Sequence, residues 1–490
     1  MLDTLKNLES YKVFEFFHAL NQIPRGSGNE TAVSNWLVDF AKKRNLEVKQ
    51  DAVKNVIIKK PGTRGYEQAK TVILQGHMDM VCEKEADSPH DFSKDPIAFI
   101  VEGDSLHADK TTLGADDGMA VAMSLAILDS NDIPHPPLEV LLTVSEETGM
   151  DGAEGLDVAD ISGRTLINID SEEEGEFLVG CAGGVEVYFH LPITWKDIPQ
   201  DAALATLKVS GLFGGHSGSD INKGRGNAIK LLARVLYQLA KESEYHIVKI
   251  NGGTKHNAIP RETTACIAFN KKDTAKVQKL VEAYTALFKN ELFGSDDGVS
   301  LELLPCDCEK QCKKVFSKKT TENLVKLLLI TRHGLIEMSQ AIPGLVQSSN
   351  NVAIVETDKT KNEVKVSCAV RSSIASCKAA IADEFAVVAE LCGAQVEFSA
   401  GYPAWEYTPK SPIRDVFVKV YKDMFGKEPI VTAIHAGLEC GLFAKKFGGE
   451  LDQISFGPDI RNAHTPKEHT SISSVDRSWK FLKAVLAELK

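Results

Sequence analysis

The sequence predicts an α/β protein with a mostly parallel β-sheet that helices cover on both faces, and an α+β domain inserted into it. Short, continuously apolar segments, typical of buried strands, alternate with segments whose apolar residues recur at helical spacing. The 490 residues exceed what one hydrophobic core usually serves, which indicates at least two domains. Residues that suit one catalytic site lie on both sides of a long middle region, which indicates that this region is the insertion.

The N-terminal part contains most of the predicted sheet. Apolar residues recur at helical spacing over 11–23 and 30–43, and the turn-forming run Pro24-Arg25-Gly26-Ser27-Gly28 separates these two helices. Strand-like apolar runs follow at 55–60, 71–76, 138–144 and 165–169, with a helical pattern at 118–128. Ligands of such sheets bind beyond the carboxyl ends of the strands, so polar residues directly after these runs form the candidate site.

The middle of the chain has a different pattern. Its expected strands and amphipathic helices occur in a mixed order, which is typical of an α+β layer. The expected strands are 205–210, 263–270 and 362–371, and the expected helices are 228–241, 275–290 and 322–331. We place the inserted α+β domain at 187–400, with a discontinuous domain that carries the candidate site at 1–186 and 401–490. No sequence repeat and no low-complexity linker marks these boundaries.

Composition and charge narrow the possible partners and the compartment. The formal net charge is −12 and no Lys/Arg-rich run occurs, which argues against nucleic acid or an anionic membrane as the main partner. The N-terminal residues lack a basic segment followed by an apolar stretch, and no run of about eighteen apolar residues occurs. We therefore expect a cytoplasmic protein.

The chain contains ten cysteines, which are scattered rather than arranged as a small disulfide framework. Reduced thiols are the simpler interpretation. Cys306, Cys308 and Cys312 form the one cluster, but their spacing is not C-x-x-C and no partner pair lies nearby, so a structural zinc site is disfavoured.

Residues at or near the ends of apolar runs combine the side-chain types that hold zinc, namely imidazoles and carboxylates. The candidate ligands are His77, Asp116, Glu147, Asp170 and His464. His464 follows the apolar run 453–456, far downstream of the others. Since ligands of one centre must lie within a few ångströms of one another, the intervening chain must loop out and return.

The motif Gly76-His77-Met78-Asp79 places a carboxylate two residues after the candidate imidazole. Asp79 could accept the second imidazole N–H, which fixes the tautomer and raises the basicity of the ligand. The alternative is a core histidine whose N–H the aspartate satisfies. Asp116 and Asp117 begin a helical pattern and could instead cap that helix, although Asp116 as a bridging ligand and Asp117 as the cap are compatible.

The adjacent pair Glu146-Glu147 directly follows an apolar strand. Neighbouring residues point in different directions, so one carboxylate can bind metal while the other accepts a proton from water, as metal-assisted hydrolysis requires. The alternative is a solvated, acidic start of a helix. For the acids after Asp170, residues 172–174, a solvated or supporting run is the favoured interpretation.

Taken in order, these motifs resemble a known family, the dinuclear-zinc exopeptidases that include carnosinases, aminoacylases and glutamate-releasing carboxypeptidases. The similarity is greatest to the aminoacyl-histidine dipeptidase branch and covers essentially the whole chain. It rests on HMDM at 77, TTLGADDG at 111, EETGMDGA at 146, INIDSEEEGE at 167, GGHSGSDI at 214, NGGTKHNAIPRE at 251, HAGLECGLF at 435 and HTPKE at 464.

The resemblance implies a zinc-exopeptidase-like catalytic domain with two zinc ions per subunit. It implies that His77 and Asp170 hold one ion, that Glu147 and His464 hold the other, and that Asp116 and a hydroxide bridge them. Glu146 would be the general base and Asp79 would orient His77. The same side-chain types also suit manganese or cobalt.

The resemblance further implies roles for residues of the inserted domain. His216 would donate a hydrogen bond to the developing negative charge, often across a homodimer interface, and Asn257 and Arg371 would bind the substrate. Gly437 could offer a backbone N–H to the same ligand. From the sequence alone, His216 could instead be a turn histidine and Arg371 an exposed strand charge.

The function implied by the resemblance is a cytoplasmic, homodimeric metallo-dipeptidase that hydrolyses short peptides, preferentially Xaa-His dipeptides including carnosine. Its partner would be a dipeptide substrate, with no nucleic acid and no membrane. Two alternatives remain open: an N-acyl-amino-acid deacylase on the same scaffold, and a catalytically silent peptide-binding protein.

Overall fold

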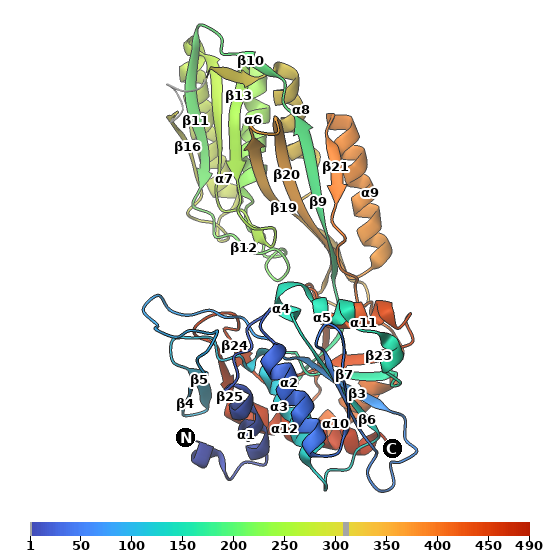
Figure 1. Cartoon of the computed structure of the whole chain (residues 1–490). Coiled ribbons are helices and arrows are strands. Elements are labelled where there is room, and N and C mark those ends of the chain that lie inside the picture. Colours follow the sequence, from blue (N-terminus) through green and yellow to red (C-terminus); the bar gives the residue numbers. More distant parts are fainter. Residues whose placement is uncertain (1, 307–312) are drawn as a thin grey trace. The chain divides into compact units, whose positions relative to one another are not determined.

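The computed structural model of the chain describes residues 2–306 and 313–490, which form two compact units. The first unit comprises Met1–Gly180, Tyr407–Ala433 and Leu438–Lys490, and the second comprises Cys181–Glu406 and Ile434–Gly437. The chain therefore leaves the first unit after β8, returns near residue 407, and visits the second unit once more just before α11 (Figure 1).

The first unit is built on an eight-stranded sheet, in which the central strands run parallel and the edges are antiparallel. Its order is β1 (Glu47–Gln50), β2 (Val56–Lys60), β6 (Leu138–Thr143), β3 (Val72–His77), β7 (Thr165–Asn168), β23 (Asp452–Ser455), β8 (Glu176–Cys181) and β22 (Ile430–Ile434). Every residue of β3 and β6 is buried, as expected for strands covered on both faces. The predicted α/β class with a mostly parallel sheet is confirmed.

Helices and a small second sheet complete the first unit. The main helices are α1 (Tyr11–Leu20), α2 (Thr31–Lys43), α3 (Ala115–Asp129), α10 (Pro412–Phe425), α11 (Glu439–Lys446) and α12 (Ile472–Glu488), and the short ones are α4 (Glu146–Gly149) and α5 (Asp151–Gly155). The second sheet contains β24 (Ile460–Arg461), β25 (His469–Ser471), β5 (Ser105–Ala108) and β4 (Phe99–Glu102). Helix α3 contacts both β3 and α1 and is buried on nearly all sides, which agrees with its apolar sequence.

Aromatic side chains join the returning C-terminal helices to the sheet. The ring of Phe481 on α12 stacks on Phe177 of β8 at 5.4 Å and meets Phe417 of α10 edge-on at 5.3 Å. Phe456, just after β23, contacts both Phe417 and Phe481. Residues from both ends of the sequence thus share one core.

The second unit is built on a nine-stranded antiparallel sheet. Its strands are β9 (Gly183–Pro192), β11 (Ala202–Ser210), β13 (Tyr245–Gly252), β15 (Thr263–Asn270), β16 (Ser300–Pro305), β18 (Gly334–Met338), β19 (Val346–Asp358), β20 (Glu363–Ser372) and β21 (Gln395–Phe398). Its helices are α6 (Ala228–Glu242), α7 (Thr274–Glu291), α8 (Lys318–Ile330) and α9 (Ala375–Cys392). Two short ribbons, β10 (Trp195–Asp197) with β17 (Lys314–Phe316) and β12 (Gly215–His216) with β14 (Ala258–Ile259), lie beside it.

Eight of the nine strands belong to two βαββαβ modules with the same topology, and the ninth, β18, pairs with β19. The first runs β11-α6-β13-β15-α7-β16 and has the spatial order β16-β11-β15-β13; the second runs β9-α8-β19-β20-α9-β21 and has the matching order β21-β9-β20-β19. The first module is inserted between β9 and α8 of the second. Equivalent strands β13 and β19 join them in antiparallel pairing, with Asn251 opposite Glu356. The sheet therefore repeats its topology about a local twofold relation.

Cys266 and Cys306 form a disulfide, so the expectation of reduced thiols is wrong for this pair. Sheet pairing brings β15 and the end of β16 to one apolar cluster, where the two Cα atoms lie 6.3 Å apart, a distance usual for disulfides. Cys308 and Cys312 of the disfavoured zinc cluster lie outside the described residues. Within the described residues, no helix is both long enough and apolar enough to cross a bilayer.

Replacing Phe481 with alanine should destabilise the first unit, because the side chain is only 3% exposed and packs between three elements. Truncation of a buried phenylalanine costs about 3–5 kcal/mol of unfolding free energy. Urea unfolding followed by circular dichroism should show a lower midpoint for Phe481→Ala. Met424→Ala, which removes a 40% exposed side chain from α10, should leave the midpoint unchanged. A wild-type midpoint for Phe481→Ala would contradict the assigned core.

Candidate metal centre

The predicted ligands all lie in the first unit, near the carboxyl ends of neighbouring strands. His77 is the last residue of β3, Asp170 follows β7, and Glu147 lies in α4 directly after β6. Asp116 lies in the first turn of α3, and His464 lies in the connection between β24 and β25. The sheet topology thus brings together residues from distant parts of the sequence.

Distances among these side chains define two groups that could each hold a metal ion and that share Asp116. His77 Nε2 lies 3.2 Å from Asp116 Oδ1 and 3.6 Å from Asp170 Oδ1. His464 Nε2 lies 3.0 Å from both Asp116 Oδ2 and Glu147 Oε2. One oxygen of Asp116 therefore faces each imidazole, the arrangement that a bridging carboxylate requires.

The chemistry of these donors fits divalent metal ions. Among the described residues, Glu147 Oε1 is buried without a hydrogen-bond partner, and a buried anionic oxygen without a partner is costly. Burial acts to lower the pKa of His77, but hydrogen bonds to Asp116, Asp170 and Asp79 outweigh it and raise that pKa well above its usual value. The acids thus require positive charge among them, which protons or metal ions can supply.

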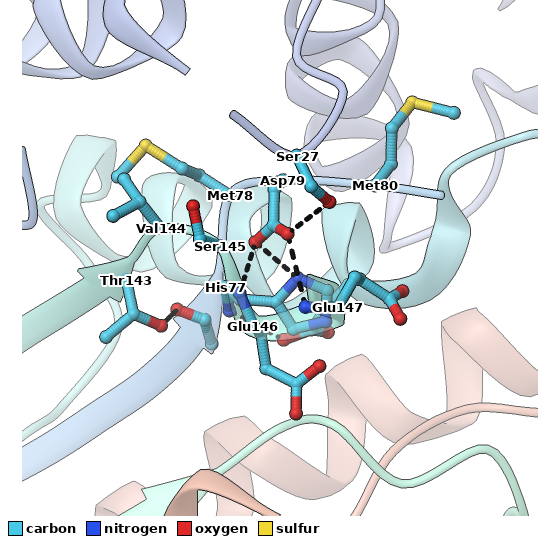
Figure 2. Close-up of polar contacts among 12 residues, drawn as sticks. Ser27, His77, Met78, Asp79, Met80, Thr143, Val144, Ser145, Glu146 and Glu147 are labelled. Carbon is cyan, nitrogen blue, oxygen red and sulfur yellow. Dashed lines mark hydrogen bonds and ion pairs between the residues drawn. The ribbon is translucent and has the colours of Figure 1, made fainter. Parts of the chain in front are cut away.

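Asp79 connects the first imidazole to the strand-to-helix turn that carries the glutamate pair. Its Oδ1 lies 3.2 Å from His77 Nδ1, which leaves Nε2 facing the other ligands. It also accepts hydrogen bonds from Ser27 Oγ at 2.7 Å and from the backbone N–H groups of Glu146 and Glu147 at 3.1 and 3.3 Å (Figure 2). These contacts orient His77 and hold α4 at the same time.

Glu146 and Glu147 follow a left-handed residue, Ser145, whose φ is +54°. Glu30 holds this turn, since its Oε1 accepts hydrogen bonds from the N–H and the hydroxyl of Ser145 at 3.1 and 2.9 Å. The two carboxylates of the pair then point in different directions (Figure 2). Burial, with the charges of Asp170, Glu439 and Glu147, raises the pKa of Glu146 well above its usual value, so this carboxyl readily accepts a proton.

The side chain of Asp117 does not cap helix α3. Asp116 and Asp117 have non-helical φ and ψ angles within Ala115–Asp129, and the side chain of Asp117 turns toward β3. There Asp117 Oδ2 accepts the backbone N–H of His77 at 3.1 Å. Burial and the charge of Asp170 raise the pKa of Asp117 well above its usual value.

The acids after Asp170 differ from one another. Glu174 forms a paired contact with Arg477 at 2.6 and 2.7 Å, and Glu173 pairs with Arg461, as expected of a supporting run. Glu172 is only partly exposed, and burial with the charges of Asp116 and Asp170 raises its pKa to about 8.

Three other acids near the centre were not singled out from the sequence: Glu30, Glu439 and Glu468. Glu439, at the start of α11, is fully buried and accepts hydrogen bonds from Gln75 Nε2 at 2.6 Å and Thr143 Oγ1 at 2.7 Å. Burial raises its pKa to about 7. Each of these acids bonds residues distant in sequence, so no local pattern could identify it.

The second unit holds the other predicted site residues. His216 Nδ1 accepts the backbone N–H groups of Gly218 and Ser219 at 3.3 and 3.2 Å, so the proton of the neutral ring lies on Nε2. Burial and the charge of Arg371 lower the pKa of His216. His216 is thus arranged as a neutral Nε2–H donor, and the backbone carbonyl of Asn257 holds the next residue, Ser217, at 2.8 Å.

Arg371 is partly free to bind an anion. Its Nη1 donates to the hydroxyl of Tyr402 at 2.7 Å, while Nε is buried without a partner among the described residues. Gly437 lies against the same tyrosine ring, where a Cβ atom would approach within 2.7 Å. The second unit therefore places both Arg371 and Gly437 against Tyr402.

Comparison with known proteins gives matches over both a single module and the whole chain. The family described as a peptidase dimerisation domain matches residues 207–296, which correspond to most of the first βαββαβ module. The cytosol non-specific dipeptidase of Escherichia coli strain K12 is 39% identical over 488 residues, which cover 100% of this chain and 99% of that protein.

Solved structures give the same result. The aminoacylhistidine dipeptidase of Vibrio alginolyticus has a TM-score of 0.90 and 39% sequence identity, over 99% of this chain and 98% of that one. An aminopeptidase of Bacillus cereus shares the fold at a TM-score of 0.56 and 16% identity, over 98% of this chain and 99% of that one. The chain belongs to the M20 family of peptidases, in the branch that contains the Vibrio alginolyticus and Escherichia coli dipeptidases.

Proposed function

We propose that this protein is a cytosolic, zinc-dependent dipeptidase that hydrolyses short peptides, preferentially Xaa-His dipeptides including carnosine. The observation that carries the proposal is the pair of ligand groups that share Asp116, with Glu146 beside them. Two full-length relatives, a cytosol non-specific dipeptidase and an aminoacylhistidine dipeptidase, support the substrate class and the compartment.

In this proposal, two zinc ions occupy the two ligand groups. The ligand assignment is His77 and Asp170 for one ion, Glu147 and His464 for the other, and Asp116 between them. Two bound ions lower the pKa of a water molecule and polarise the scissile carbonyl. Asp79 keeps the proton of His77 on Nδ1, so that Nε2 remains a ligand.

Glu146 moves the proton in the proposed reaction. A carboxylate beside the ligand groups suits a base that takes a proton from the attacking water and returns it to the leaving amine. The breaking bond is the amide C–N bond, and the products are a free carboxylate and a free amine. Because Ser145 and Glu30 fix the turn, Glu146 faces away from Glu147 and the two tasks remain separate.

The second unit supplies groups that suit the remaining parts of the substrate. The Nε2–H of His216 would donate to the oxygen that gains negative charge, and Arg371 would bind the terminal carboxylate. Asn257 and Gly437 would complete the substrate-binding set. The match to a peptidase dimerisation domain supports a homodimer formed through this unit, with the range 187–400 as the lid.

An N-acyl-amino-acid deacylase is the alternative that uses the same centre, because the same water can attack any suitably placed amide. A panel of free dipeptides and acetylated amino acids separates the two reactions. Faster hydrolysis of the acetylated compounds would overturn the dipeptidase proposal, and binding of dipeptides without turnover by the metal-loaded protein would indicate a peptide-binding protein.

Removal of metal should abolish release of histidine from alanyl-histidine and β-alanyl-histidine, and added zinc should restore it. Glu146→Gln should lower kcat by at least about 100-fold, because the base is lost while the ligands remain. Zinc content, measured by atomic absorption, should stay at two ions per subunit in this variant. Glu154→Gln, an exposed acid of the neighbouring helix α5, is the matched control and should retain wild-type turnover. Full activity of chelator-stripped protein would contradict the proposal.

His216→Ala should lower kcat by about 100- to 1,000-fold, the usual effect of losing one donor to a developing oxyanion. KM and zinc content should change little, because the side chain neither holds metal nor binds the substrate in its ground state. The control is His190→Ala, which removes a partly buried histidine from β9 of the same unit. An unchanged kcat would show that His216 is only a turn histidine.

A further inference from the structure

We propose that Glu468 is a positioning residue of the metal centre, which fixes the bridging carboxylate Asp116 relative to the ligand His464. The inference rests on the proposed two-metal function. Glu468 lies four positions after His464. It belongs to neither of the two ligand groups, and it was not predicted from the sequence to be a site residue.

The contacts of Glu468 are with the backbone that leads into Asp116. Its Oε2 accepts the N–H groups of Leu113 and Gly114 at 2.7 and 2.9 Å. Its Oε1 accepts those of Ala115 and Asp116 at 2.7 and 3.3 Å. Consecutive N–H groups of one loop thus surround a single carboxylate, as in backbone nests that bind anions.

Arg25 holds the same loop from its other side. This buried guanidinium donates to the carbonyl of Gly114 at 2.5 Å and to the carbonyls of Met78 and Asp79 at 3.1 and 3.0 Å. The backbone of Gly114 is therefore held twice, because its N–H donates to Glu468 and its C=O accepts from Arg25. Gly114 has a φ of +71°, and an added Cβ would lie 2.4 Å from Arg25 Nη2, so only glycine fits between them.

This double attachment matters because Asp116 must serve two imidazoles at once. Its oxygens lie 3.2 Å from His77 Nε2 and 3.0 Å from His464 Nε2, so a small shift of its backbone lengthens at least one contact. Glu468 belongs to the same segment as His464, which has an unfavourable left-handed φ of +61°. One carboxylate therefore ties the bridge and a terminal ligand together, and loss of such supporting partners typically weakens metal binding about 10- to 100-fold.

Glu139 provides a matched control for a merely structural role. Both glutamates are 2% exposed, and Glu139 likewise accepts loop N–H groups, from Ser162 at 3.0 Å and Gly163 at 2.8 Å. It lies at the start of β6, at the end of the strand away from Glu146 and Glu147. Replacing either glutamate therefore removes hydrogen bonds of a buried carboxylate, but only Glu468 lies close to the candidate metal ligands.

The test compares zinc affinity and thermal stability of Glu468→Gln, Glu139→Gln and the wild-type protein. Affinity is measured by competition with a chromophoric chelator, and stability by the unfolding midpoint of the metal-free proteins. We expect both variants to unfold at lower temperature, and only Glu468→Gln to bind at least one zinc ion 10- to 100-fold more weakly. Its kcat should recover partly when zinc is raised.

Wild-type zinc affinity in folded Glu468→Gln would overturn the inference, as would equal weakening in Glu139→Gln. If Glu468→Gln does not fold, Glu468→Asp and Glu139→Asp replace the pair, and weaker zinc binding in the first alone is expected. Failure of the proposed function is distinguishable, because it would appear as wild-type protein that binds no zinc or does not hydrolyse dipeptides.

Discussion

The structure depends on the concentration of buried negative charge at the carboxyl ends of β3, β6 and β7. Acids near this centre fall into two groups. Asp79, Glu30 and Glu468 accept backbone N–H groups, which neutralise them locally and fix loops. By contrast, the ligand carboxylates face imidazoles, and Glu147 Oε1 has no partner among the described residues. The backbone thus satisfies Asp79, Glu30 and Glu468, whereas Glu147 Oε1 remains in need of a cation or a donor.

The inserted unit shows how a fold can be symmetric where the sequence is not. Its two βαββαβ modules share one strand order and meet through equivalent strands, β13 and β19, although no sequence repeat is visible. Topology is set by the order of apolar strands and helices, which many different residues can satisfy. The peptidase dimerisation domain matches only the first module, at 207–296, and this module also carries His216. The second module carries Arg371 on β20, so the predicted substrate groups are divided between the modules.

Most of the candidate ligands could be singled out from the sequence because they follow an apolar strand or start a helix, and such patterns are local. His77 and Glu147 could be placed at one sheet edge from periodicity alone, since parallel strands end together. Glu468 could not, because its partners lie at 113–116 and nothing near it in sequence signals a nest. The same limit applies to the disulfide between Cys266 and Cys306, which depends on strand pairing. Asp117 is a different case: its sequence position suits a helix cap, but its side chain accepts the backbone N–H of His77 instead.

The groups of the second unit that we propose for substrate binding would constrain the substrate at one end only. The unpaired Nε of Arg371 suits a terminal carboxylate, and both a dipeptide and an N-acyl amino acid carry one on the leaving side. The Nε2–H of His216 suits any amide carbonyl that gains negative charge. Neither group can therefore distinguish the two reactions, which differ only in the free ammonium at the other end of a dipeptide. That ammonium is a cation, so a carboxylate of the first unit, rather than a donor of the second, would have the chemistry to select for it.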